Sequence, residues 1–354
     1  MANCCRSMNK TSLFSSRVFS VATVLAVVYL GGARPAQAQP AAVQQSDTAT
    51  RAQQLQTPLG PGLKDEKVPM LYEGELEDTG PQYLLAAKPK HKWFNISSDF
   101  QIYRTDNATL APNNTGASDV SVLTLQGVVQ GEVMDWFGVQ AVPRGGFRYQ
   151  SFWYGALSGR DHRIGPAGGL PVKNNDFMTY TPFGEVNLQK GSILGSFGVR
   201  YAAFTNDNAV TSGTFYQEWV PYWLAGYQWS IAQNQNLTAQ YDGDFRFTNS
   251  QSGGLQPVGW NDRTDHAFSL IYNYILGGNW VIQPSYRFQY SYYTYSARQR
   301  NDVYNTLSLV VAYYFNDWAA VRFLTSYEWR SSSELGNNYQ NYNIGVGANL
   351  SYSF

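Results

Sequence analysis

Residues Tyr342–Phe354 read YNIGVGANLSYSF, and their pattern gives the clearest indication of the fold. Large apolar residues occupy every second position, and small or polar residues occupy the positions between them. Strict alternation of this kind predicts a β-strand with one apolar face and one polar face. The apolar face consists of Tyr342, Ile344, Val346, Ala348, Leu350, Tyr352 and Phe354.

The same period of two recurs upstream as far as Trp93. It predicts an all-β fold, a transmembrane antiparallel up-and-down β-barrel of about twelve strands. Short connections are expected near 134–136, 190–192, 232–235, 277–279 and 316–317, with longer loops between them. Short turns at one end and long loops at the other are typical of outer-membrane barrels. The expected strands are 93–104, 119–133, 137–152, 177–189, 193–205, 214–231, 236–248, 265–276, 280–295, 303–315, 318–331 and 341–354.

Composition excludes several other classes of protein. Charged residues make up 14% of the 354 residues, aromatic residues make up 16%, and the formal net charge is zero. A helical membrane protein needs apolar runs of about 20 residues, which the chain lacks. A nucleic-acid binder usually carries a surplus of basic residues. In a membrane barrel, apolar residues that face lipid alternate with polar residues that face the lumen. This alternation explains why the chain is rich in aromatic residues although its average composition is polar.

The N-terminus predicts export. Basic residues precede the apolar run Val18–Leu30, and Ala36-Gln37-Ala38 offers a cleavage site, so residues 1–38 are expected to be a cleaved signal peptide. Both cysteines, Cys4 and Cys5, lie in this signal. The mature chain therefore has no cysteine for a disulfide or a thiolate metal site.

Residues 39–91 are expected to form a mostly disordered periplasmic segment, followed by the barrel at 92–354, because 39–91 are rich in Gln, Ala and Pro. Within the segment, Met70–Leu85 alternates between acidic and apolar residues. This stretch is interpreted mainly as a linker, and the alternative is that it docks elsewhere or plugs the mouth of the barrel.

These features together resemble the Gram-negative outer-membrane β-barrels. The signal peptide, the alternating strands and the terminal Leu350-Ser351-Tyr352-Ser353-Phe354 carry the resemblance. It implies that Leu350, Tyr352 and Phe354 form a signal read by the barrel-assembly machinery. It also implies a location in the outer membrane, with membrane lipid and lipopolysaccharide as surroundings.

With the apolar face outward, the charged residues of each strand point into the lumen. Arginine binds carboxylates and phosphates in a bidentate way and stays charged. Two interpretations follow: a narrow pore that guides an anionic solute, or a lumen filled by paired charges. Twelve strands lie between the filled eight-strand barrel and the wide sixteen-strand channel. The lumen-lining candidates are Arg144, Arg148, Arg200, Arg246, Arg287, Arg322, Glu185, Asp242 and Asp99, and the wider inward set adds Arg330, Glu132, Glu218, Asp244 and Glu328.

The longest loop, 153–176, carries four basic side chains. A solvated surface loop is the default expectation, and an inward fold that narrows the pore is the alternative. The four residues are Arg160, His162, Arg163 and Lys173.

Aromatic residues at the strand ends suit the two membrane interfaces. Trp136, Trp280 and Trp318 fit the short-turn interface. An inward set that stacks on sugars, with Tyr222 or Phe183, is the functional alternative. The set expected at the opposite interface is Tyr290, Tyr292, Tyr295, Tyr327 and Trp329.

Enzyme chemistry finds little support. Hydrolysis by a nucleophile needs a histidine with a Ser or Asp partner within reach. The three histidines are His91, His162 and His266, and none has such a partner on its own strand face. The sequence therefore favours a porin-like channel for small solutes, anions included, and no enzyme, cofactor, metal or nucleic-acid partner. A filled, non-conducting barrel is the alternative, and a lipid-directed hydrolase is the remote one.

Overall fold

The structure is a computed structural model, and it describes residues 43–47, 49–50, 91–112, 116–164, 170–206, 213–249, 258–295, 299–334 and 336–354. The expected signal peptide, 1–38, and the stretch Met70–Leu85 lie outside the described residues. No helix in the described ranges is long and apolar enough to cross a membrane.

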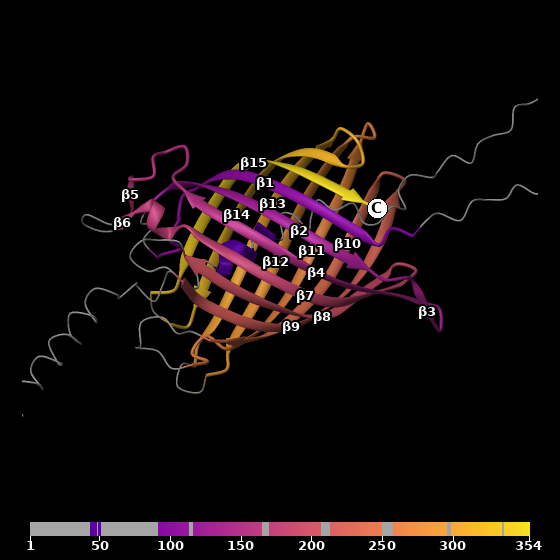
Figure 1. Cartoon of the computed structure of the whole chain (residues 1–354), viewed down its shortest axis with the longest axis horizontal. Coiled ribbons are helices and arrows are strands. Elements are labelled where there is room, and N and C mark those ends of the chain that lie inside the picture. The colour runs from indigo at the N-terminus through magenta and orange to yellow at the C-terminus, as the bar shows by residue number, and fades with distance from the viewer. Residues whose placement is uncertain are drawn as a thin grey trace, which may run out of the picture.

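Twelve long antiparallel strands form a closed ring, as the alternation predicts (Figure 1). Each strand pairs with the next along the chain, and β1 pairs with β15 to close the ring. The predicted strand positions are confirmed to within two or three residues. The ring strands are β1 (Phe94–Thr105), β2 (Ser118–Gln130), β4 (Val139–Tyr154), β7 (Phe177–Lys190), β8 (Ile193–Asn206), β9 (Gly213–Ala232), β10 (Gln235–Thr248), β11 (Arg263–Leu276), β12 (Trp280–Tyr293), β13 (Asn301–Tyr314), β14 (Ala319–Ser332) and β15 (Tyr339–Ser353).

The two ends of the barrel differ. One end, which we call the short-turn end, carries tight connections such as Gly277-Gly278, where both glycines adopt positive φ values of 62° and 82°. Such values suit glycine because it has no Cβ to clash. The barrel also begins and ends at this end, where Phe94 and Phe354 exchange backbone hydrogen bonds of 3.0 and 2.9 Å. The opposite, long-loop end carries the longer connections.

One predicted short turn is wrong in detail. Residues 134–136 do not turn but form a three-residue strand, β3 (Met134–Trp136), which pairs with the start of β4. The turn itself is Phe137-Gly138, both with positive φ, and the Asp135 carboxylate accepts a hydrogen bond from the Gly138 N–H at 2.9 Å. This hairpin extends beyond the ring. Glu132, expected inside the lumen, is therefore exposed in the connection that follows β2.

The β4–β7 connection lies over the long-loop end. It contains β5 (Arg163–Ile164), β6 (Leu170–Pro171) and the short 3₁₀ helix η2 (Val172–Asn175). Ile164 and Val172 are buried in the main apolar cluster, which anchors the loop on the barrel.

The charged residues of this loop remain at the surface. Arg160 pairs with Asp176, and Lys173 Nζ lies 2.5 Å from Asp161 Oδ1. The hydrogen bond from Lys173 lowers the pKa of Asp161 below its usual range. His162 and Arg163 are also exposed. The charged residues of the loop thus match the surface-loop expectation, whereas Ile164 and Val172 point to the barrel.

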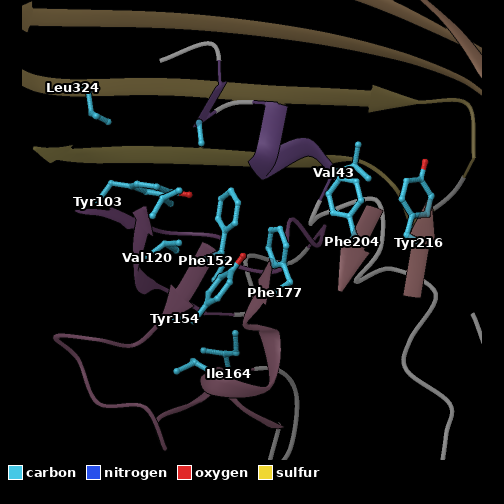
Figure 2. Close-up of a cluster of buried hydrophobic side chains, with 14 of the residues drawn as sticks. Val43, Tyr103, Val120, Phe152, Tyr154, Ile164, Phe177, Phe204, Tyr216 and Leu324 are labelled. Atoms are coloured by element: carbon cyan, nitrogen blue, oxygen red, sulfur yellow. The ribbon is translucent and has the colours of Figure 1, made fainter. Parts of the chain in front are cut away.

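The main apolar cluster lies inside the ring near the long-loop end (Figure 2). Six consecutive strands, β1 to β9 in ring order, each contribute an inward side chain to it. These side chains have the same parity as the inward charged or polar residues farther along each strand, such as Asp99 on β1 and Gln126 on β2, so they face the lumen and not lipid. The members are Tyr103, Val120, Val122, Phe152, Phe177, Phe204 and Tyr216, and we call this set the apolar wall.

Most of the expected aromatic positions at the strand ends point outward and are exposed, including Trp136, Trp280 and Trp318. Tyr295 differs, since it follows β12 and its ring lies 5.3 Å from that of Trp260 in the loop.

Candidate functional site

All nine lumen candidates lie on ring strands with their side chains directed inward. Arg246 illustrates the contrast: it is 3% exposed, while its neighbours Phe245 and Phe247 are 44% and 56% exposed on the outer face. The strand alternation therefore assigns the faces of these residues, but it does not give their partners.

Between the short-turn end and the middle of the barrel, the inward charges form ion pairs that still contact solvent. Arg144 Nη1 lies 3.2 Å from Glu185 Oε1. Arg287 binds Asp242 in a bidentate way, with both contacts at 2.6 Å. The side chains of Arg144 and Asp242 remain 29% and 27% exposed. Water therefore reaches these groups.

Arg322 and Asp99 form a buried pair that spans the seam of the barrel. Arg322 (β14) donates to both carboxylate oxygens of Asp99 (β1) at 2.5 and 2.8 Å, across the intervening strand β15. Gly347 is the β15 residue between them, and a Cβ there would lie 3.0 Å from the guanidinium carbon of Arg322. The missing side chain at Gly347 leaves room for the arginine to reach across.

Near the long-loop end, Arg246 is the centre of a buried charge cluster. Its guanidinium contacts four carboxylates, and Arg263 pairs with one of them, Asp265, at 3.0 Å. The four are Asp47 at 2.8 Å, Asp265 at 3.0 Å, and Glu218 and Asp244 at 3.2 Å each.

Arg263 and Asp265 were not among the sequence-predicted candidates. Arg263 lay before the expected strand, which began at 265, whereas Asp265 was its first residue and was not assigned to the lumen. Both residues share the parity of Ala267 and Ser269, which places them on the inward face of β11.

Six of the nine candidates are inward arginines. Among the described residues, Arg148 differs from the other five in that it contacts no carboxylate. Its polar partners are Gln126 Oε1 at 2.9 Å and Thr50 Oγ1 at 3.2 Å. It also lies over the Phe183 ring at 6.0 Å from the centroid. On the neighbouring strands, Phe183 is the register partner of Arg200, which lies over the Tyr222 ring at 5.4 Å. Arginine and aromatic side chains thus alternate across β4, β7, β8 and β9.

A segment far from the barrel in sequence lies inside it. Residues 43–47 and 49–50 are helical, and in Figure 1 they form the indigo piece within the ring of strands. Val43 and Ala49 are buried in the apolar cluster (Figure 2). The other residues of 39–91, which were also expected to be disordered, lie outside the described residues except for His91. From the sequence, a plug was expected only as an alternative for Met70–Leu85.

Polar side chains of this segment contact three sides of the ring. Gln44 Nε2 donates to Glu328 Oε2 (β14) at 3.1 Å, and Ser46 donates to Gln150 Oε1 (β4) at 2.8 Å. Asp47 accepts from Arg246 (β10) at 2.8 Å. Three further contacts are Gln45 to the Ala108 carbonyl, and Arg148 and Gln150 to Thr50 Oγ1.

The segment fits its surroundings closely. The cavity between Gln44, Gln45 and the wall residues Tyr103, Glu328 and Asn341 has a volume of about 10 Å³. This volume holds one water molecule at most.

The three histidines lie far apart. His266 faces outward, where its Nδ1 lies 2.7 Å from the Tyr241 hydroxyl. His91 contacts the Gln130 carbonyl at 3.1 Å, and His162 is exposed in the β4–β7 loop. Within the described ranges, none of the three rings is hydrogen-bonded to a Ser, Asp or Glu side chain, and no three His, Cys, Asp or Glu residues group as metal ligands.

Comparison with known proteins gives no matching family and no matching curated protein. Solved structures do match. The chain is similar to outer-membrane β-barrels. They include the β-domain of a Bordetella autotransporter (14% identity, TM-score 0.43, 74% of this chain and 100% of that one). An outer-membrane channel from Pseudomonas putida F1 has 11% identity and a TM-score of 0.47, over 78% of this chain and 100% of that one. An anion-selective porin from Comamonas acidovorans has 11% identity and a TM-score of 0.35, over 73% and 98%. At these identities the likeness concerns the barrel architecture alone.

Proposed function

We propose that the protein is an outer-membrane channel for the passive passage of small solutes, with a preference for anions. The observation that carries the proposal is the closed twelve-strand ring with an apolar outer surface and water-accessible charges in the lumen. In this orientation the short-turn end faces the periplasm and the long-loop end faces the exterior.

The outer surface supports a membrane location. Leu350, Tyr352 and Phe354 are more than half exposed, and the outward face of every ring strand carries comparable residues. An apolar belt of this extent is unfavourable in water and suits lipid. Export through a cleaved signal, lipopolysaccharide as a neighbour and delivery by the barrel-assembly machinery, which would read the terminal strand, belong to the same proposal.

The preference for anions rests on Arg148. Most inward arginines are neutralised by a carboxylate, whereas Arg148 is held by neutral groups. A guanidinium that faces the lumen without a carboxylate in direct contact lowers the energy of a passing anion and raises that of a cation. Arg200, whose contact with Asp244 is long at 3.5 Å, lies two strands away.

Solute uptake by proteoliposomes tests the proposal. Liposomes that contain the refolded full chain should take up an acidic monosaccharide faster than a neutral one of the same size. Protein-free liposomes and liposomes with heat-denatured protein are the controls. Uptake no faster than in these controls, both for the full chain and for a variant lacking residues 43–50, would reject a channel.

A filled barrel without conductance is the second candidate. The observation that favours it is the density of ion pairs near the long-loop end, where Arg246 and Glu218 are each 3% exposed. The same uptake experiment separates the two candidates, because a filled barrel admits neither sugar even without residues 43–50.

A further inference from the structure

We infer that the helical residues 43–47 and 49–50 form a plug that closes the lumen from within, and that the channel opens when this segment leaves its site. The inference rests on the proposed channel function, since it specifies how that lumen is regulated. It concerns a segment of this chain and its binding site inside the long-loop half of the barrel.

The contacts of the segment reach around the whole lumen. Counting from β1, the strands that bind Ser46, Asp47 and Gln44 are the third, seventh and eleventh of the ring, which are β4, β10 and β14. These strands are spaced by thirds of the circumference. A helix that contacts all three walls at once lies across the passage, and a solute has to displace it.

The lumen wall is complementary to the segment. One half of the ring presents the apolar wall, which includes Phe152 and Phe204, and Val43 and Ala49 are buried with it. The other half presents charged and polar groups, where Asp47 and Gln44 bind. In an empty, water-filled lumen the apolar wall would be exposed at a cost in free energy. The wall is therefore explained by an occupant that carries apolar as well as polar side chains, as this segment does with Val43 and Ala49 beside Ser46 and Asp47.

Departure of the segment leaves no charge stranded. Arg246 keeps its contacts to Glu218, Asp244 and Asp265 when Asp47 leaves. With Arg200, Arg246 and Arg263 nearby, the cluster without Asp47 has three cations and three carboxylates. A buried ion would oppose opening if it lost its only partner, and this cluster avoids that penalty.

The tether allows movement. Forty residues, 51–90, join the segment to the barrel, which begins at the short-turn end. Extended chain covers about 3.3 Å per residue, so this length exceeds the roughly 45 Å of a fourteen-residue strand. With the predicted cut after Ala38, Val43 is also close to a free chain end. The segment can therefore withdraw towards the periplasmic side without unfolding the barrel.

Cysteine cross-linking tests whether the segment occupies this site. Both native cysteines, Cys4 and Cys5, lie in the predicted signal peptide, so Ser46→Cys with Gln150→Cys introduces one defined pair into protein that lacks residues 1–38. A short, reducible thiol–thiol cross-linker should join the pair in this folded protein in membranes, detected as a mobility shift on a denaturing gel. The matched control is Ser46→Cys with Ser196→Cys, which places the second thiol on β8 near the short-turn end. The control pair should stay unlinked, and failure of the first pair to link in folded protein would overturn the plug.

Current recordings on the same protein test whether the segment closes the channel. Cross-linked protein should remain closed, and reduction should restore the openings of the uncross-linked protein. Deletion of residues 43–50 should raise the open fraction about tenfold or more, since several hydrogen bonds that favour the closed state are lost. Linked protein that conducts as well as reduced protein would overturn the inference while leaving the channel intact. If the cysteine pair cross-links but the variant without residues 43–50 carries no current, the proposed channel function would be rejected instead.

Discussion

Asp47 and Arg246, which are 199 positions apart in the chain, are joined inside the barrel by a hydrogen bond of 2.8 Å. Asp47 belongs to the segment before the barrel, and Arg246 lies on β10 at the centre of the buried charge cluster. The contact links closure of the lumen to one carboxylate. Its loss should therefore change the gating of the channel more than the stability of the barrel.

Asp47→Asn should increase the open fraction of the channel. Hydrogen bonds to charged groups contribute about 1.5–3 kcal/mol, and asparagine keeps a neutral acceptor, so we expect an increase of about tenfold, which corresponds to about 1.4 kcal/mol. Single-channel recording in planar bilayers measures the open fraction. The matched control is Asp161→Asn, which removes the same charge from an exposed loop. An equal effect in both variants would point to surface charge rather than to the plug.

Arg148→Gln should weaken the preference for anions. A unit charge about 7 Å from a permeating ion contributes roughly 0.6 kcal/mol in water, which is about threefold in the permeability ratio. The reversal potential in a salt gradient measures this ratio. Arg104→Gln removes the same charge from the exposed outer face of β1 and should leave the reversal potential unchanged. An unaltered potential in Arg148→Gln would show that this guanidinium does not select for anions.

Arg322→Met should destabilise the barrel by about 3–5 kcal/mol, because it leaves the Asp99 carboxylate buried and unpaired. Adding Asp99→Asn should recover much of this loss, since the remaining group is neutral. Urea unfolding in detergent, followed by tryptophan fluorescence, gives both values. If the double variant were as unstable as the sum of the two single variants, the pair would not act as a unit.

The strands were predictable from sequence because each one separates lipid from lumen. Side chains such as Phe245, Arg246 and Phe247 then alternate with a period of two, which fixes the face and the approximate ends of a strand. The β3 hairpin was not predictable in this way, since it extends beyond the ring and all three residues of β3 are exposed. Its position depends on the left-handed Phe137-Gly138 turn.

The site was predictable only in part. Alternation placed Arg322 and Asp99 in the lumen. It does not show how far along the barrel axis each residue lies, or whether a side chain can contact another across an intervening strand. Their pairing through the space at Gly347 was therefore missed. The inward apolar wall was missed because apolar residues were expected on the outward face, and no inward apolar cluster was considered. The plug was missed because its short helix, with Gln44, Gln45 and Ser46, has the composition of a linker and is stabilised by the barrel around it.

Deletion of Phe354 should greatly lower the amount of protein in the outer membrane, whereas it should lower the stability of the folded barrel only slightly. The ring of Phe354 stacks on Phe94 with centroids 5.6 Å apart and remains half exposed, so its contribution to stability is about 1–3 kcal/mol. If the assembly machinery reads the terminal residue before folding, the loss in cells should be severe while refolding in detergent is nearly intact.

The control for this deletion is Phe315→Ala, which removes another exposed aromatic ring at the short-turn end. Outer-membrane fractions probed by immunoblot should contain normal amounts of this variant. Normal amounts of the protein without Phe354 would contradict the proposed assembly signal.

Whether the lumen conducts is measured by the ionic current through purified protein that lacks residues 43–50, in a planar bilayer with a salt gradient. The protein is first shown to be folded by its resistance to denaturation in unheated detergent. We expect discrete current steps, a much larger open fraction than in the full chain, and a reversal potential displaced towards that of the anion. A flat baseline from this folded, unplugged barrel would contradict the assignment of the lumen as a channel.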